Sequence, residues 1–100
     1  MFIVTYRFML PTDRTREYIA IEQKAIQIYL EHGCLGVEIY RDSKDPRYWL
    51  EINKFMDQEH YDRVIAKVDE DPRIAPLFEE FKSLFEKGKM PEKGAYLRML

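Results

Sequence analysis

The sequence is poor in cysteine, in glycine and in long apolar runs. Its one cysteine, Cys34, cannot form a disulfide within the chain, and one thiol does not make a metal site. Its four glycines form no phosphate-cradling loop or nucleotide fingerprint. No apolar run approaches the roughly 20 residues that a helix needs to cross a bilayer, so no membrane partner is expected. The N-terminus has neither a basic stretch nor a small-residue cleavage site, which favours a cytoplasmic protein.

The chain also lacks an excess of charge of one sign. Its 16 basic and 18 acidic residues give a net charge of -2, which offers no electrostatic reason to bind nucleic acid. What it does have is apolar material, at 46% of 100 residues. That amount suits one domain over residues 1–100, with a core small enough to gain from a partner subunit.

Strand-like and helix-like patterns follow one another in a recognisable order. Runs of β-branched and aromatic residues predict strands over residues 2–10, 34–41, 48–55 and 95–100. Helical spacing predicts helices over about 13–32, 57–68 and 71–85, the last packed through Leu77, Phe78 and Phe81. The order β-α-β-β-α-(α)-β predicts an α+β, ferredoxin-like βαββαβ fold. It has a four-stranded antiparallel sheet and an extra helical segment before the last strand.

Alternation along the predicted strands divides their side chains into two faces. The face expected beneath the helices is almost wholly apolar: Phe2, Val4, Tyr6, Phe8, Leu35, Val37, Ile39, Tyr48, Leu50, Ile52, Ala95, Leu97 and Met99. The other mixes aromatic and charged residues: Ile3, Thr5, Arg7, Met9, Gly36, Glu38, Tyr40, Trp49, Glu51, Asn53, Phe55, Tyr96, Arg98 and Leu100. This second face is more apolar than a solvent-exposed face of a sheet usually is. We therefore expect it to be buried in a homodimer, with Glu51, Arg7 and Arg98 paired across it.

The first predicted helix carries the ionisable residues of most interest. Its apolar side spans roughly 200°, and Glu22 falls inside it, as does His32 in the last turn. A carboxyl group in apolar surroundings has a raised pKa suited to proton transfer, and a histidine nearby can do similar work. Glu22 and His32 are therefore the candidate catalytic residues. Their structural alternatives are an arginine pair for Glu22 and a helix-end position, favoured by the macrodipole, for His32.

Three tyrosines are candidates for substrate binding. Tyr6, Tyr18 and Tyr29 can supply both apolar walls and hydroxyl groups to a pocket, although aromatics at these spacings more often form core. His60 is expected as an exposed residue in the first turn of the second helix. No metal-ligand spacing or Ser/His/Asp set is present, so no metal site is predicted.

The pattern resembles the dimeric α/β-barrel superfamily, and within it the antibiotic biosynthesis monooxygenase-like domains. The element order carries the similarity over the whole chain, and its local part is the segment 49–57 followed by Glu59-His60-Tyr61. Such domains often place a glutamate on the third strand, here Glu51, then an aromatic and an acidic helix cap, here Asp57. Many members have a histidine where this chain has Arg63. The haem-degrading relatives need an asparagine on the first strand, which is absent, so the resemblance does not imply haem.

The resemblance implies a homodimer with a cavity between sheet and helices. It also implies a cofactor-independent monooxygenase that acts on a small organic molecule, often an aromatic one, without a bound cofactor or metal. The superfamily contains proteins without known activity as well, and fold alone does not fix function. The alternative is a non-catalytic dimeric module that binds a small molecule or serves in a stress response.

Overall fold

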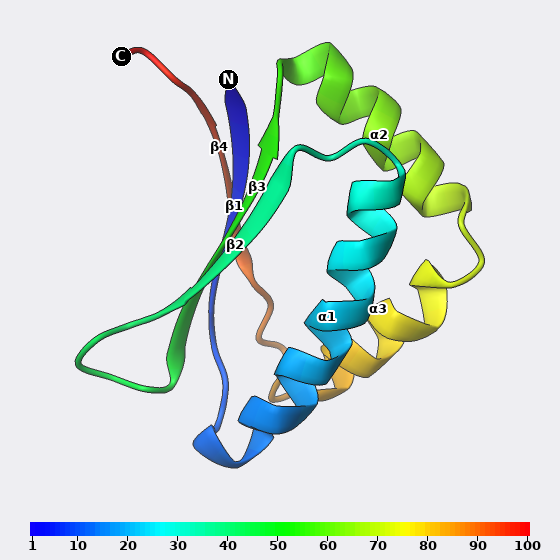
Figure 1. Ribbon diagram of the computed structural model, residues 1–100. Coiled ribbons are helices and arrows are strands. Elements are labelled where there is room, and N and C mark those ends of the chain that lie inside the picture. The colour runs from blue at the N-terminus through cyan, green and yellow to red at the C-terminus, as the bar shows by residue number, and fades with distance from the viewer.

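Four strands form one antiparallel sheet in the computed structural model, which describes all 100 residues (Figure 1). In chain order the strands are β1 (Phe2–Met9), β2 (Gly36–Arg41), β3 (Tyr48–Phe55) and β4 (Glu92–Leu97). Their order across the sheet is β2-β3-β1-β4, and each neighbouring pair is antiparallel. This is the ferredoxin-like βαββαβ arrangement, so the predicted fold class is confirmed.

Three helices cover one face of this sheet and leave the other face bare (Figure 1). They are α1 (Thr15–Glu31), preceded by the 3₁₀ turn η1 (Thr12–Arg14), α2 (Gln58–Glu70) and α3 (Ile74–Ser83). The extra helical segment predicted before the last strand is α3. None of the helices has the length and apolar character needed to span a membrane.

The last strand lies three residues earlier than the sequence predicts. Residues 92–94 were expected to be loop, yet Glu92 pairs with Arg7 and Lys93 with Tyr6 in the β1–β4 ladder. Backbone pairing with a neighbouring strand needs no apolar side chain. The hydrophobic pattern alone therefore does not indicate the first three residues of β4.

Local chemistry ends α1 and begins α2. Gly33, two residues after the last residue of α1, has a φ of +105°, a left-handed position that suits glycine. The side chain of Asp57 accepts a hydrogen bond of 2.7 Å from the backbone N–H of His60 at the start of α2. The expectation of an exposed His60 is wrong, because this side chain is buried and its Nδ1 accepts a 2.9 Å hydrogen bond from Met56 N–H.

The predicted division of faces is wrong for β3 alone. Direct pairing places Trp49 opposite Phe8, Glu51 opposite Tyr6 and Phe55 opposite Phe2, all on the helix-covered face. Trp49 and Phe55 are buried near the two ends of the strand. Burying both large rings fixes the phase of the strand, and Glu51 is carried under the helices with them. Glu51 therefore does not pair with Arg7 or Arg98.

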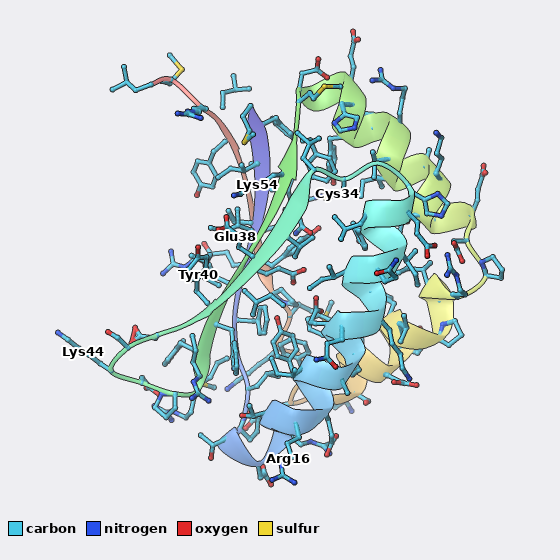
Figure 2. The ribbon with its side chains drawn as sticks, viewed as in Figure 1. Arg16, Cys34, Glu38, Tyr40, Lys44 and Lys54 are labelled. Carbon is cyan, nitrogen blue, oxygen red and sulfur yellow. The ribbon has the colours of Figure 1, made fainter.

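The bare face carries the residues of β3 that were expected in the core. It comprises Ile3, Thr5, Arg7, Met9, Gly36, Glu38, Tyr40, Tyr48, Leu50, Ile52, Lys54, Glu92, Gly94 and Tyr96, and is called the open face below. Figure 2 shows Glu38 and Tyr40 on the side of the sheet away from the helices. Three of its tyrosines, at positions 40, 48 and 96, are about half exposed.

Candidate functional site

A cavity of about 390 Å³ lies between the helix-covered face of the sheet, α1 and α3. Ligand pockets commonly span roughly 300–1,000 Å³ and combine apolar walls with a few polar groups. Its lining fits that description: Tyr6, Ile21, Glu22, Ala25, Ile26, Tyr29, Val37, Glu51, Asn53, Ile74, Leu77, Phe78, Phe81, Met90, Pro91 and Lys93. The polar groups come mainly from α1 and the three strands β1, β3 and β4.

Two carboxyl groups from different elements meet in this cavity. Glu22 projects from the middle of α1, where only 7% of the residue is exposed. Glu51 projects from β3 beside Tyr6 of β1. The two carboxyl groups lie close enough to share a hydrogen bond, and the side chain of Asn53 lies beside Glu51. A hydrogen bond between two carboxyl groups requires a proton on one of them.

The surroundings determine which carboxyl group holds that proton. Burial, the charge of Glu51 and the hydrogen bond with Glu51 together raise the pKa of Glu22 to about 9. Burial also raises the pKa of Glu51, but the hydrogen bonds from Glu22 and Asn53 oppose that rise. Glu22 is therefore the member of the pair that keeps its proton at neutral pH, and Glu51 is the more readily ionised of the two.

Two of the three candidate tyrosines line the cavity. Burial raises the pKa of the Tyr6 and Tyr29 hydroxyls well above its usual value, so both remain protonated donors. Tyr18 lies outside the cavity lining, fully buried, with its ring 5.0 Å from that of Trp49 and 5.3 Å from that of Phe8. Its hydroxyl has no hydrogen-bond partner. The structure thus brings Tyr6 and Tyr29, but not Tyr18, to Glu22.

His32 is not brought to the cavity. Its Nε2 lies 2.9 Å from Oδ2 of Asp71, in the loop between α2 and α3. The Arg73 guanidinium, and then His32, hold the pKa of Asp71 well below its usual range. Arg73 also contacts Glu31 in the last turn of α1. This network ties the end of α1 to the start of α3, which is a structural use of His32.

Sequence reasoning missed Glu51, Asn53 and Lys93 as cavity residues. The first two were assigned to the wrong face, although the burial of Trp49 and Phe55 at positions i–2 and i+4 from Glu51 would have indicated the right one. Lys93 lies outside the strand predicted over residues 95–100, whereas β4 begins three residues earlier and includes it. Phe78, expected in the core, is half exposed at the cavity edge.

The side chains of the cavity offer acid–base chemistry and hydrogen bonding. Glu22 and Glu51 supply a proton and a carboxylate within one hydrogen bond of each other. No group of three or more histidine, cysteine, aspartate or glutamate side chains gathers anywhere in the protein as a metal site. The residues present thus form a proton-handling pair in an otherwise apolar chamber.

Comparison of the sequence with models of known protein families identifies the family of this chain. The model of one family, described as "Antibiotic biosynthesis monooxygenase", matches residues 1–64, which include both carboxyl groups of the pair. The chain belongs to the antibiotic biosynthesis monooxygenase family. A comparison with curated proteins finds no match.

Solved structures share the fold of this family member at low sequence identity. The oxygenase SnoaB from Streptomyces nogalater, described as cofactor-independent, is 13% identical, with a TM-score of 0.77 over 99% of this chain and 93% of its own. A conserved protein from Methanosarcina mazei Go1 is 16% identical, with a TM-score of 0.76 over 95% and 89%. At such identities the likeness establishes the fold, which agrees with the family assignment.

Proposed function

We propose that this protein is a cofactor-independent, monooxygenase-like enzyme that oxidises a small, electron-rich organic molecule. The observation that carries the proposal is the carboxyl pair Glu22–Glu51 in a mostly apolar cavity, where Glu22 is buried and Glu51 is partly buried. A binding module needs the apolar walls but has no use for two adjacent carboxyl groups withdrawn from water, which cost stability. The family and the fold shared with a cofactor-independent oxygenase support the same activity.

The proposed reaction begins with loss of a proton from an acidic C–H group of the substrate. Glu51 is the base, since it carries the negative charge of the pair, and the substrate becomes a carbanion. The carbanion gives its electron pair to O₂, forming a C–O bond, and Glu22 protonates the distal oxygen to yield a hydroperoxide. Loss of water across the C–H and O–O bonds leaves a carbonyl group, so one CH₂ and one O₂ become one C=O and one H₂O.

The remaining side chains hold the substrate and exclude water. Tyr6 and Tyr29 present protonated hydroxyls that can donate hydrogen bonds to a substrate oxygen as negative charge develops on it. Ile21, Ile74 and Phe81 form apolar walls that suit an aromatic ring. A low-polarity chamber strengthens the interaction between the anion and these donors.

Anthrone is a suitable probe substrate, because its CH₂ group is acidic and its oxidation to anthraquinone consumes one O₂. We expect Glu51→Gln and Glu22→Gln to lower the rate of oxygen uptake about 100-fold or more, a typical acid–base contribution, while anthrone still binds. Glu31→Gln is the matched control, since it makes the same change on an exposed part of α1. Unchanged turnover in both cavity variants would remove the pair from the mechanism. Binding of anthrone without oxidation by the wild type would favour the binding module.

We also propose that the open face is the interface of a homodimer. Its apolar residues, among them Leu50 and Ile52, have no helix above them, and three half-exposed tyrosines surround them. Light scattering at micromolar concentration should give about twice the chain mass of 12.1 kDa. Leu50→Arg should yield a folded monomer, and a wild-type protein that is already monomeric would contradict the interface.

A further inference from the structure

Opposite charges lie on the two sides of Tyr6 along one row of the sheet. Tyr6 on β1 pairs directly with Glu51 on β3 and with Lys93 on β4. Paired residues of an antiparallel sheet project to the same face, so all three point toward the helices, and all three line the cavity. Two strand spacings place the backbones of Glu51 and Lys93 about 10 Å apart.

The ammonium group of Lys93 is held in place and lacks an anionic partner. Its Nζ donates a 2.9 Å hydrogen bond to the Tyr61 hydroxyl and lies 5.4 Å from the centre of that ring. None of the salt bridges of the protein includes Lys93. Lys93 is also the one basic residue among those that line the cavity. Lys93 is exposed, so its ammonium stands at the open edge of the cavity, where a cation without a salt-bridge partner is suited to an anionic ligand group.

We propose that the substrate is an aromatic acid, with its carboxylate bound by Lys93 and its reacting group at Glu51. The charges set this orientation, because a carboxylate beside Glu51 would face a like charge in a buried site, whereas beside Lys93 it meets an unpaired cation. Tyr6, between the two charges, lies under the ring that joins the two ends of the substrate. Lys93 is thus a specificity-determining residue. This inference rests on the proposed function for the role of Glu51 and on the sheet register for the role of Lys93.

The test compares two ligands that differ by one carboxylate at the end remote from their hydroxyl group. They are 2-naphthol and 6-hydroxy-2-naphthoate, whose dissociation constants are measured by calorimetry without any turnover. We expect the wild type to bind the naphthoate about tenfold more tightly, as one charge-assisted hydrogen bond provides. Raising the salt concentration to about 0.5 M should reduce this preference, because the ammonium is near the surface.

Variants at position 93 show whether the lysine is responsible. Lys93→Met should abolish the preference for the naphthoate and leave the affinity for 2-naphthol unchanged within about twofold, whereas Lys93→Arg should keep the preference. Lys89→Met is the matched control, since Lys89 is exposed, pairs with Glu86 and does not line the cavity. Circular dichroism confirms that each variant is folded.

The outcomes separate this inference from the proposed function. A preference that survives in Lys93→Met, a wild type that prefers 2-naphthol, or a wild type that binds neither compound overturns the inference. None of these results bears on the oxidation of anthrone, which has no carboxylate. Conversely, a lysine-dependent preference in a protein that binds anthrone without oxidising it retains the anion subsite and rejects the oxygenase.

Discussion

Two adjacent rows of side chains, one aromatic and one ionisable, occupy the same layer of this protein. The aromatic row consists of Phe8, Trp49 and Tyr18, and the carboxyl row consists of Tyr6, Glu51 and Glu22. The corresponding members of the two rows are two residues apart on each strand and one helical turn apart on α1. Phe8 pairs with Trp49 as Tyr6 pairs with Glu51, so the backbone supports both rows in the same way.

The difference between the rows separates what the fold needs from what a site needs. Three large rings pack together in the aromatic row, where Tyr18 meets Phe8 edge to face and is tilted against Trp49, and the fold uses them to bury apolar area. The carboxyl row holds one buried and one partly buried acid that apolar residues could replace without changing the backbone, and it lines a cavity of about 390 Å³. The fold would be at least as stable without these acids, which points to a functional reason for them.

The largest effect on stability should come from truncating the aromatic row. Tyr18 is fully buried and Trp49 nearly so, and Trp49→Ala should lower the free energy of unfolding by about 3–5 kcal/mol. The matching change in the carboxyl row is the double variant Glu22→Leu/Glu51→Leu, which should be neutral or stabilising, because it removes both partners together. Urea unfolding at pH 7 measures both. A double variant as unstable as Trp49→Ala would show that the fold depends on the carboxyl pair.

The next effect is a pH dependence that belongs to the carboxyl row. The pKa of Glu22 is raised from 4.5 to about 9 in the folded protein, so its proton stabilises the fold at low pH. That stabilisation is complete below about pH 4.5 and is lost as the pH rises toward 9, by up to about 1.4 kcal/mol per pH unit. Glu22→Gln should therefore gain stability relative to the wild type between pH 5 and 8. A constant difference between the two unfolding curves would contradict a raised pKa.

A smaller contrast is expected within α3, between two phenylalanines three residues apart. Phe81 packs with its ring centre 5.6 Å from that of Phe8, whereas Phe78 is about half exposed. Phe81→Ala should cost about 2–3 kcal/mol in unfolding free energy and Phe78→Ala less than about 1 kcal/mol. Equal losses would mean that Phe78 is buried in solution, as its helical spacing had predicted.

The smallest effect should come from the one hydroxyl that the aromatic row contains. The Tyr18 hydroxyl is buried without a hydrogen-bond partner, so Tyr18→Phe should be neutral or raise the free energy of unfolding by up to about 1 kcal/mol. The oxidation of anthrone should not change, because Tyr18 does not line the cavity. A loss of more than about 1 kcal/mol would reveal a partner for this hydroxyl, such as a buried water.

The sequence predicted the elements of this fold and only half of its candidate pair. Helical spacing placed Glu22 on the buried side of α1, because periodicity reports a residue's orientation on one element directly. Glu51 was assigned to the wrong face, because every residue of 48–55 except Glu51, Asn53 and Lys54 is apolar and either phase buries several of them. Packing of Trp49 and Phe55 against other elements determines which alternate side chains of β3 face the helices. This is a tertiary effect that the sequence of one strand does not reveal.

Similar limits explain the other differences. His32 and Asp71 are 39 residues apart, so their contact depends on how α3 docks against α1 and has no signature in the sequence. Lys93 reaches the cavity through its pairing with β1, whereas local composition indicated a loop. Glu22, whose orientation its own helix sets, was predicted, whereas the cavity positions of Glu51 and Lys93 and the His32–Asp71 contact depend on neighbouring elements and were not.

The central claim is that Glu22 and Glu51 share one proton at neutral pH. The direct measurement is a carbon-13 NMR titration of the glutamate side-chain carboxyl resonances, assigned with Glu22→Gln and Glu51→Gln. We expect Glu22 to remain protonated through pH 7 and to titrate near pH 9, and both resonances to report the coupled pair. Titration of Glu22 near its ordinary pKa of 4.5, independently of Glu51, would contradict the account.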